Sequence, residues 1–301
     1  MSSDPTPLAP GLYLVATPIG NLGDITLRAL DVLRAADLIA CEDTRQTQKL
    51  LNHFAVDART VSYHMHNERE RSAELVEAIT SGKRVALVSD AGTPGINDPG
   101  GWLVTEAIAA GVAVIPIPGA NAALAALIAS GLTTEEFVYL GFLPEKAGAR
   151  RTRLEDLAAQ PRATAQTLIF YEAPHRILET LADVEAAFGD LPRAAVGREL
   201  TKLHEEFLRG PVSEIRRSLA ARDRVRGEFV LLLEAPARSA SQLGAPGLDS
   251  ETRENIGARV ARMQAEEGLD EKDALKRLAR ETGQSKSELY RELQRERARR
   301  K

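Results

Sequence analysis

The chain has 301 residues, of which 44% are hydrophobic and 27% are charged, and these globular proportions exclude a disordered chain and a coiled-coil rod. Its formal charge of −4 gives no global attraction to nucleic acid, although a sum conceals how the charge is distributed. A length of 301 residues exceeds what one hydrophobic core usually serves, so we expect at least two domains.

The cysteine content and the N-terminal segment bear on the compartment. Cys41 is the single cysteine, so the chain can form neither an internal disulfide nor a cysteine-based zinc cluster. The N-terminus has no cationic region before an apolar core, and no apolar run reaches the roughly 20 residues that span a bilayer. We therefore expect a cytoplasmic protein without a membrane segment.

Strand-like and helix-like segments alternate through the first part of the chain. Strands are predicted at 12–16, 38–41, 85–89 and 112–116, and helices at 25–36, 44–54, 68–80, 102–110 and 120–130. This rhythm is typical of a parallel sheet with helices on its faces. Asp24 and Asn67 are placed to cap the helices that follow them. Residues 11–131 are thus predicted to form one α/β domain.

The alternation loosens between residues 132 and 235. Strands are predicted at 137–142, 166–171, 193–198, 205–208 and 229–234, and helices at 176–188 and 212–221. Because strands here follow one another without full helical crossovers, the sheet should be mixed. Residues 132–235 are predicted to form a second α/β domain, and the Pro-, Gly-, Ala- and Ser-rich segment 236–250 a linker.

The charge changes sign beyond the linker. Residues 251–301 carry a net charge of +3, residues 1–250 carry −7, and the last 26 residues carry +6. Ala279, Gly283 and Leu289 have the spacing of a helix-turn-helix, with a small residue, a turn glycine and an apolar anchor. A charged helical hairpin that packs on its own body satisfies the same pattern. We therefore predict a basic helix-turn-helix-like module over 251–301 and leave its partner open.

Four loops follow predicted strands, where open α/β sheets bind ligands, whereas the signatures GxGxxG, GxxxxGK[ST], GxSxG and HExxH are absent from the sequence. The loops span residues 17–24, 89–101, 117–122 and 170–176. The second loop has four glycines and two prolines in 13 residues, so it can extend neither a strand nor a helix. It is also longer than a strand–helix connection needs, which favours a binding role. A tight strand–helix turn would explain the first loop equally well.

The loops and their neighbours carry a family resemblance. The motifs, in chain order, are TPIGNLGDIT, CEDTRQTQKLL, SYHMHNE, SDAGTPGINDPG, PGANAALAALIASGL, FYEAPHRI and GRELTKLHEE. Over about residues 11–235 they resemble the bacterial 16S ribosomal RNA cytidine-2′-O-methyltransferases, which belong to the S-adenosylmethionine-dependent tetrapyrrole methylase superfamily. The basic tail is similar to the small helical C-terminal module of these enzymes. Several long motifs agree in order and spacing, which makes chance a poor explanation.

The resemblance implies that S-adenosylmethionine lies folded in a cleft between the two α/β domains. By motif position, its approach is lined by Pro18 and Gly20, and its methionine and ribose are held by Ala91, Gly92, Thr93, Pro94 and Ile96. One wall of the cleft is closed by Gly119, Ala120 and Asn121, and the adenine is framed by Tyr171, Glu172, Gly227 and Glu228. Small-molecule tetrapyrrole methylases usually carry Gly-Asp-Pro where this chain has Gly92-Thr93-Pro94. The ribosomal RNA branch shares that difference, which favours an RNA acceptor.

The implied reaction places few demands on the protein. A ribose 2′-hydroxyl is a poor nucleophile, but a sulfonium methyl is already activated, so in-line positioning and a place for the hydroxyl proton are the main requirements. The candidate bases or orienting groups are Glu172, His175, Lys202, Glu205 and Glu206. Lys202 would need a lowered pKa to act as a base, which burial could supply, or it could equally hold a phosphate.

A metal centre is not expected. His64 and His66 would lie on one face of an extended segment with Glu68 nearby, but no third ligand has the spacing to complete a site. His66 and Asn67 are better explained as residues that face the acceptor or cap the next helix. Arg45, after two acidic residues, could orient an RNA phosphate, although an acid-rich helix start has a structural explanation of similar weight.

RNA contacts require local cations even on an acidic protein. Lys146, Arg150, Arg151 and Arg153 form one cluster in a predicted Gly/Ala loop, and the tail forms another. A solvated face would explain the first cluster as well. Aromatic residues make up only 4% of the chain, which favours recognition through RNA shape and backbone over base stacking.

These expectations converge on a methyltransferase for a cytidine 2′-oxygen in the decoding region of 16S ribosomal RNA. The implied partners are the small ribosomal subunit and a second copy of the chain. One alternative is a methylase of the same fold that acts on a small tetrapyrrole, for which the basic module would be superfluous. The other is a non-enzymatic regulator that senses S-adenosylmethionine and binds DNA through its tail, which would usually require a symmetric dimer with a free recognition helix.

Overall fold

The computed structural model describes residues 8–189, 193–238, 256–267, 269–282, 289–290 and 293. The described residues up to 238 belong to one compact unit and those from 256 onward belong to another, and we describe each unit by itself. Within the described residues, no helix is both long enough and apolar enough to cross a membrane.

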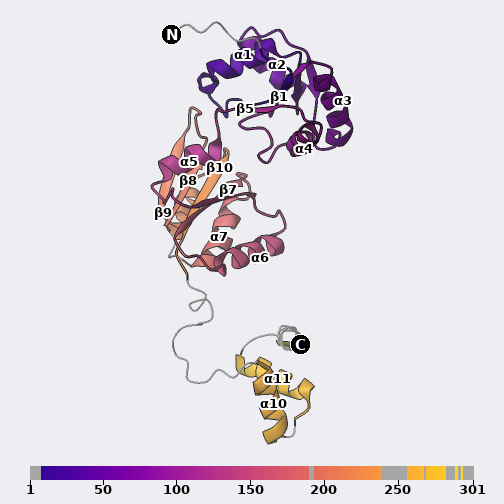
Figure 1. The fold of residues 1–301 in the computed structure, drawn as a ribbon. Helices are drawn as coiled ribbons and strands as arrows, with labels where there is room; N and C mark the ends of the chain where they lie inside the picture. Colours follow the sequence, from indigo (N-terminus) through magenta and orange to yellow (C-terminus); the bar gives the residue numbers. More distant parts are fainter. Residues whose placement is uncertain are drawn as a thin grey trace. The chain divides into compact units, whose positions relative to one another are not determined.

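The first sheet, at the top of Figure 1, has five parallel strands in the order β3-β2-β4-β1-β5. Its strands are β1 (Gly11–Val15), β2 (Leu38–Cys41), β3 (Thr60–Ser62), β4 (Arg84–Val88) and β5 (Val114–Ile117). Its helices are α1 (Leu27–Ala35), α2 (Thr44–His53), α3 (Glu68–Thr80) and α4 (Gly101–Ala109). Successive strand residues point to opposite faces, so Tyr13 packs with α1 and α2 whereas Leu12 packs with α3 and α4.

Strands β1 and β4 are neighbours, but the chain leaves them in opposite directions. After β1 it enters α1 on one face of the sheet, and after β4 it enters α4 on the other face. The two loops therefore diverge at the carboxyl ends of adjacent strands, which is the topological switch point where open α/β sheets bind ligands.

Some local details of the first sheet differ from the sequence prediction. Residues Leu22–Asp24 form a short 3-10 helix, so the N-cap of α1 is Thr26, whose Oγ1 accepts a hydrogen bond from Ala29 N at 3.0 Å, and not Asp24. Asn67 precedes α3 as predicted, but its Oδ1 accepts from His64 N at 2.8 Å and caps no helical N–H. Strand β3 was not predicted, because three residues are too few to show an alternating pattern.

The second sheet is mixed, as predicted, with strand order β6-β7-β10-β8-β9. Strands β6 (Phe137–Phe142) and β7 (Gln166–Glu172) are parallel, and the other pairs, which involve β8 (Arg193–Arg198), β9 (Glu206–Pro211) and β10 (Phe229–Ala235), are antiparallel. The predicted strand at 205–208 thus begins one residue later and extends to Pro211.

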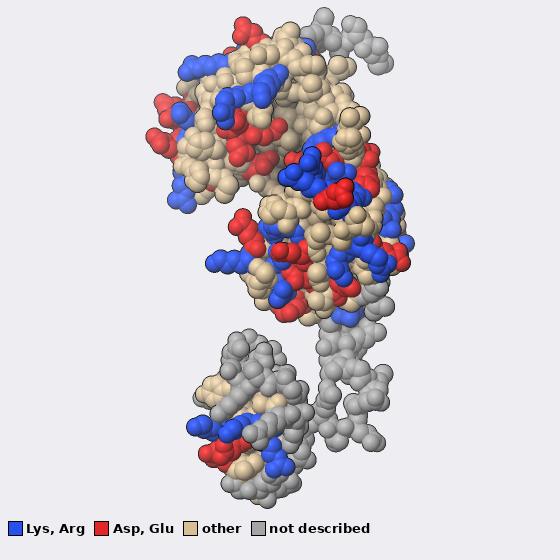
Figure 2. All heavy atoms as spheres, turned by 180° about the vertical axis from the view of Figure 1, so that it is seen from behind, with Lys and Arg blue, Asp and Glu red and all other residues tan. Residues whose placement is uncertain are grey.

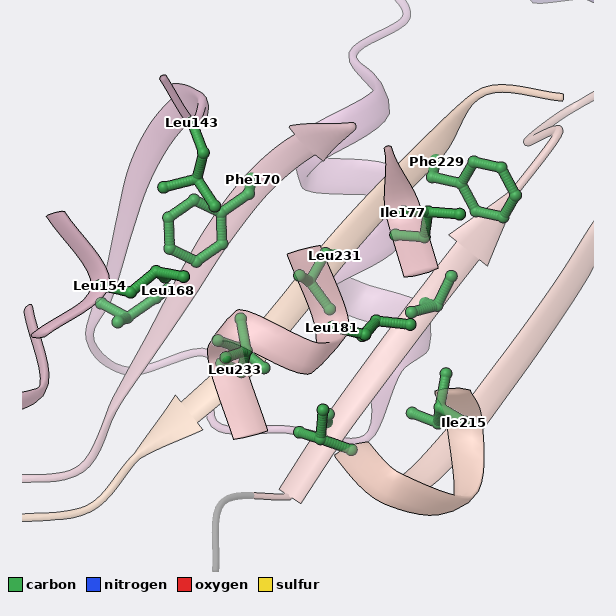
Figure 3. Close-up of a cluster of buried hydrophobic side chains, with 14 of the residues drawn as sticks. Leu143, Leu154, Leu168, Phe170, Ile177, Leu181, Ile215, Phe229, Leu231 and Leu233 are labelled. Atoms are coloured by element: carbon green, nitrogen blue, oxygen red, sulfur yellow. The ribbon is translucent and has the colours of Figure 1, made fainter. Parts of the chain in front are cut away.

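Helices cover both faces of the second sheet. On one face α6 (Ala147–Ala158), α7 (Ile177–Phe188) and α8 (Val212–Ala220) enclose a core that includes Leu154, Phe170 and Leu231 (Figure 3). On the other face lies α5 (Ala122–Ser130), whose Ala126 and Leu127 pack with Ile169 and Leu232. Helix α5 follows β5 of the first sheet in the chain, so it connects the two sheets and fixes the loop before it against the second.

Helix α6 corrects the prediction of a cationic Gly/Ala loop at 146–153. Its Leu154 and Leu157 are buried, and the Arg150 side chain is 2% exposed and pairs with Asp183 (Nε to Oδ2, 2.7 Å). Arg151 pairs with the same carboxylate at 2.8 Å. Ala147 and Ala149 at the start of α6 are strong helix formers, which offsets the low helix propensity of Gly148, and two of the four cations are engaged in ion pairs.

The C-terminal unit contains a helix pair with its own core. Helices α10 (Ile256–Glu267) and α11 (Glu271–Thr282) bury Val260, Met263, Leu275 and Leu278 in one cluster. Ala279 and Leu289, two positions of the predicted helix-turn-helix pattern, join this cluster. Gly283, residues 239–250 of the predicted linker and residues 294–301 of the basic tail lie outside the described residues.

Candidate functional site

The loops after β1 and β4 are joined at Gly92. Its N–H donates to Thr17 O at 3.0 Å and its carbonyl accepts from Thr17 N at 2.8 Å. Gly92 has φ +83°, and a Cβ there would lie 3.3 Å from Ile19 Cγ2 and 3.8 Å from Ala120 O. Glycine is needed at this point for the left-handed backbone and for the close approach of the β1 and β4 loops.

The loop before α5 is joined to the β4 loop by side chains. Thr93 Oγ1 donates to Ala120 O at 3.3 Å, and Asn121 Nδ2 donates to Thr93 Oγ1 at 3.4 Å. Asn121 Oδ1 accepts from Leu124 N at 3.1 Å and so caps α5. Asn121 therefore fixes two loops and the start of the connecting helix at once.

A cavity of about 460 Å³, the main cavity, opens between these loops and the second sheet. This volume lies in the range of about 300–1,000 Å³ that is typical of small-molecule pockets. Its lining residues from the first sheet's loops and α5 are Ile19, Ala91, Gly92, Thr93, Ile96, Asn97, Asp98, Asn121 and Ala122. The remaining lining residues are Phe142, Tyr171, Glu172, Ala173, Pro174, Leu200, Glu228, Phe229 and Val230.

A bulge in β6 seats the β4 loop against the second sheet. The β6–β7 register shifts between Tyr139 and Gly141, and a Cβ at Gly141 would lie 2.7 Å from Asn97 Oδ1. Asn97 itself has φ +65°, a conformation that asparagine tolerates better than most residues. This contact holds the neighbouring Asp98 at the wall of the main cavity.

Asp98 is the functional candidate that the sequence analysis missed. Burial raises the pKa of its carboxyl to about 6; a hydrogen bond with Ser89 opposes the rise, and the charges of Glu42 and Asp90 add to it. A half-buried carboxylate on a ligand-sized cavity, with carboxylates as neighbours, favours a cationic ligand group. The sequence shows only an acid inside a Gly/Pro loop, because the neighbours that perturb it come from other segments.

A second cavity, of about 400 Å³, adjoins the first and is termed the adjoining hollow. It shares Ile19, Ala91 and Glu228 with the main cavity. Its other lining residues are Thr17, Pro18, Gly20, Leu22, Gln46, Thr47, Lys49, Leu50, Ser89, Asp90 and Lys202. The two cavities are thus adjacent at these three residues, and Gln46, Thr47, Lys49 and Leu50 of α2 line the adjoining hollow.

Lys202 lies on the adjoining hollow between two carboxylates. Its ammonium pairs with Glu228 Oε2 at 2.8 Å and with Glu199 Oε1 at 3.0 Å. Burial alone would lower the pKa of Lys202, but hydrogen bonds to Glu228 and Glu199 raise it above its usual value. A Cβ on Gly20 would collide with Lys202 Cγ, so the lysine packs directly on the β1 loop.

Comparison with known proteins agrees with this geometry. The family model for Tetrapyrrole (Corrin/Porphyrin) Methylases matches residues 11–216. The chain belongs to the tetrapyrrole methylase family. It is 46% identical over 287 residues to the ribosomal RNA small subunit methyltransferase I of Mesorhizobium japonicum, covering 95% of this chain and 92% of that protein. It is 50% identical over 255 residues to the protein of the same name from Micromonospora olivasterospora, covering 83% and 80%.

Solved structures support the fold of this tetrapyrrole methylase. The methyltransferase CobJ superposes with a TM-score of 0.55 at 18% identity, covering 74% of this chain and 93% of that one. The uroporphyrin-III-C-methyltransferase of Thermus thermophilus superposes with a TM-score of 0.50 at 20% identity, covering 75% and 92%.

The tetrapyrrole methylase is a methyltransferase, and its methyl donor is S-adenosylmethionine. The main cavity fits this donor in two respects. Leu200, Phe229 and Val230 form an apolar wall suited to a nucleoside, and the perturbed carboxyl of Asp98 suits a ligand that carries a sulfonium and an ammonium group.

The predicted cofactor residues of this tetrapyrrole methylase fall into three groups. Lining the main cavity are Ala91, Gly92, Thr93, Ile96, Asn121, Tyr171, Glu172 and Glu228, whereas Pro18 and Gly20 line the adjoining hollow. Lining neither are Pro94, Gly119, Ala120 and Gly227. Two glycines of this last group pack closely against neighbouring residues. A Cβ on Gly119 would lie 3.0 Å from Ala16 Cβ, and a Cβ on Gly227 would lie 2.5 Å from Glu199 Cγ.

The five predicted bases are mostly engaged elsewhere. Glu172 lines the main cavity, but its oxygens accept from Thr180 Oγ1 at 2.6 Å and from Ala173 N at 2.8 Å. The raised pKa of Lys202 is opposite to the lowered value that a base requires. The other three line neither cavity: Glu206 pairs with Arg222, whose hydrogen bond lowers the pKa of Glu206, and His175 and Glu205 are exposed.

The remaining sequence candidates lie outside both cavities. His64 and His66 have ring centroids 5.9 Å apart, and in the described part of the chain no three His, Cys, Asp or Glu side chains gather as metal ligands would. Arg45, in the first turn of α2, forms an ion pair with Asp43 at 2.9 Å, and its side chain is 87% exposed.

Proposed function

We propose that this methyltransferase transfers a methyl group from S-adenosylmethionine to the 2′-oxygen of a cytidine in the decoding region of 16S ribosomal RNA. The curated relatives carry the name of ribosomal RNA small subunit methyltransferases. The observation that carries the proposal is the pair of adjoining cavities. One suits the donor, and the other has a lining of mixed polar and apolar residues and shares Ile19, Ala91 and Glu228 with it.

The main cavity would hold the donor. Leu200, Phe229 and Val230 would contact the adenosine, and backbone groups of the β4 loop would hold the methionine portion. Asp98 would face the cationic groups of the donor, where its charge is most useful. When bound, S-adenosylmethionine supplies an activated methyl group, so the protein needs to supply chiefly orientation.

The acceptor ribose would enter the adjoining hollow. Its hydroxyl would lie near the shared wall, where Glu228 is the carboxylate common to both cavities. Glu228 is paired with Lys202, so the ion pair is positioned to orient the hydroxyl and to accept its proton as the methyl–oxygen bond forms. Lys202 remains a cation in this scheme and holds Glu228 in place.

The partners follow from this substrate. Small-subunit ribosomal RNA would place the reaction in the cytoplasm, and the basic C-terminal module would add an RNA contact. Acidic and basic side chains are interspersed over the face of the first unit that Figure 2 displays, which favours local over global attraction to RNA. We also propose a homodimer, supported by the exposed apolar residues Leu124 and Ile128 on α5 and Phe137 on β6.

A transfer assay tests the function. The protein is incubated with S-adenosylmethionine labelled on its methyl group and with 30S subunits, naked 16S RNA or a precorrin mixture. We expect label in 16S RNA; label on the precorrin, or label on no substrate, would contradict the proposal.

Two glycine variants connect the assay to the main cavity. Gly92→Val should abolish donor binding in calorimetry, because the side chain would enter the junction of the β1 and β4 loops. Gly111→Val is the matched control, since Gly111 also has a positive φ (+71°) but no atom within 4 Å of an added Cβ. Retained donor affinity in Gly92→Val would remove this loop from the site.

A further inference from the structure

Helix α2 has an exposed polar face that the proposed reaction does not use. Its buried side consists of Thr47 and Leu51, which pack toward the first sheet. The side chains on its exposed side are Arg45, Gln46, Gln48, Lys49 and Asn52, and His53 is exposed at its last residue. From Arg45 to Asn52 this face carries two kinds of group, cations and amides, and no apolar anchor.

Two hollows lie along this face and meet at Lys49. The adjoining hollow is lined by Gln46, Lys49 and Leu50 of α2. A further hollow of about 420 Å³, termed the outer hollow, is lined by Thr44, Arg45, Gln48, Lys49, Asn52 and Thr60. Because Lys49 lines both, the two hollows lie next to each other along α2, and together they are termed the trough.

The charges in the trough leave one cation available. Lys49 Nζ donates to Gln46 Oε1 at 3.0 Å, a neutral acceptor, and the described residues place no carboxylate in a salt bridge with it. Arg45 is already paired with Asp43, and Lys202 with Glu228 and Glu199. A phosphate at Lys49 would therefore gain a charge-assisted hydrogen bond without displacing an existing ion pair.

The remaining side chains of the trough suit nucleotides. Gln48 Nε2 donates to Asn52 Oδ1 at 2.8 Å. This bond leaves the Gln48 side chain its acceptor and the Asn52 side chain its donors, which can bond to base edges and ribose hydroxyls. The described residues that line the adjoining and outer hollows include no aromatic side chain, which disfavours base stacking. Asp90 lines the adjoining hollow and accepts a hydrogen bond from Asp43 N at 3.1 Å, and the two carboxylates would limit non-specific adhesion of polyanions.

We propose that the exposed face of α2, from Gln46 to Asn52, binds the single-stranded RNA segment that flanks the acceptor nucleotide, with Lys49 at a backbone phosphate. This inference rests on the proposed function, because it extends the RNA path from the adjoining hollow. It assigns to α2 the positioning of the strand and leaves donor binding to the main cavity.

Salt dependence of RNA binding tests the role of Lys49. Lys49→Ala is compared with Lys83→Ala. Lys83 is an exposed lysine just before β4, at the amino end of the strands, whereas α2 follows the carboxyl end of β2. The affinity of a single-stranded fragment of the methylated rRNA segment is measured over a range of salt concentrations, and donor affinity is measured by calorimetry. We expect Lys49→Ala to reduce the slope of log affinity against log salt by about 0.7, the value of one phosphate contact on a single strand. Donor affinity should not change in either variant. Equal slopes for Lys49→Ala, Lys83→Ala and the parent chain would overturn the assignment.

Cross-linking tests the path of the strand. Cys41 is buried, so Gln48→Cys supplies an accessible thiol for a short photoreactive reagent, and Ser81→Cys serves as the control at the amino end of the strands. We expect Gln48→Cys alone to cross-link nucleotides adjacent to the methylated one; equal cross-linking from both positions, or cross-links at remote nucleotides, would refute the path. Methyl transfer by the parent chain is measured in the same preparations. If the parent chain transfers no methyl group, the proposed function is wrong. If transfer is normal but Lys49→Ala leaves the salt slope unchanged and Gln48→Cys shows no specific cross-link, only the α2 assignment is wrong.

Discussion

Lys202 shows how a contact in space changes the interpretation of a residue. In the sequence it is a candidate base, but in the fold it lies between Glu199 and Glu228, which stabilise its charged form. The turn that presents it contains two non-glycine residues with positive φ, Glu199 at +50° and Thr201 at +66°. Such backbone conformations are costly and persist where the surroundings enforce them, as the Lys202 ion pairs do here.

Two variants of Lys202 distinguish a cation from a base. Lys202→Arg keeps the charge but cannot lose a proton at neutral pH, and Lys202→Met removes the charge. We expect the kcat of Lys202→Arg to stay within about threefold of the parent and that of Lys202→Met to fall roughly tenfold or more, because Glu228 loses its partner. An inactive Lys202→Arg with normal donor affinity would restore the base role.

Asp98 links donor binding to pH. Its carboxyl has a pKa of about 6 in the folded chain, against about 3.9 for an unfolded one, so the folded state holds more protons between these values. Stability therefore falls as the pH rises from about 4 to 6, and the loss is complete above pH 6. A positively charged ligand beside Asp98 favours its ionised form, so donor binding should release a proton below about pH 6.

Asp98→Asn tests this coupling. At pH 7.5 we expect the variant to be more stable than the parent by about 1 kcal/mol, a value reduced for the solvent screening of a half-buried group, and near pH 4 we expect little difference. Its donor affinity should be lower and independent of pH between 5 and 7. Urea unfolding and calorimetry provide the two measurements; a variant with parental donor affinity and parental pH dependence would remove Asp98 from the site.

At the scale of the element, α6 carries one arginine with a structural role, Arg150, and one exposed arginine, Arg153, with which it can be compared. Arg150 lies on the buried side of this helix and joins it to α7 through Asp183 and Glu179. Removing one partner of a buried ion pair leaves an uncompensated charge, which typically costs about 3–5 kcal/mol. Arg153 on the same helix is exposed and serves as the matched control.

We therefore expect Arg150→Met to lower the free energy of unfolding by about 3 kcal/mol, whereas Arg153→Met should change it by less than about 0.5 kcal/mol. Neither variant should alter the salt dependence of RNA binding. A reduced salt slope in Arg150→Met, measured where the variant is fully folded, would show that the cation contacts RNA.

The elements also show what the sequence can predict. Continuously apolar segments, such as those of β2 and β8, matched the structure to the residue. Helix α6 was missed because its N-terminal turn is rich in Gly and Ala, and β3 because it has only three residues. The four loops were recognisable from their places after predicted strands, and the first three also from their Gly and Pro content, but the perturbation of Asp98 and the ion pairs of Lys202 were not. These depend on contacts between segments that are far apart in the chain, such as Lys202 with Gly20 and Glu228.

At the scale of the whole molecule, an apolar surface suggests how two copies would associate. Leu124 and Ile128 are 48% and 79% exposed on the outer side of α5, on the sheet face toward which Phe137 of β6 also points. Exposed apolar residues grouped in this way are typical of an interaction surface.

We expect the parent chain to sediment as a dimer and Ile128→Asp to sediment as a folded monomer. Ile108→Asp is the control, because Ile108 is similarly exposed on α4 of the first sheet. A monomeric parent chain, or a dimer that persists in Ile128→Asp, would exclude α5 as the interface.

The distribution of charge fits a selective RNA enzyme. The net −4 of the chain divides into −7 for residues 1–250 and +3 for residues 251–301, and the cations of α6 are partly neutralised by its neighbours. The body would thus contact RNA through few cations, of which Lys49 is the one we assign. Specificity would come from the fit of the strand to the trough and of the ribose to the adjoining hollow.

The central claim is that the methyl group reaches a ribose oxygen of a cytidine in small-subunit ribosomal RNA. The most direct measurement digests RNA from the transfer assay to nucleosides and identifies the methylated product by mass spectrometry. The account predicts 2′-O-methylcytidine from 16S RNA, formed by the parent chain and lost in Gly92→Val. A methyl group on a nucleobase, or on the ribose of another nucleoside, would contradict it.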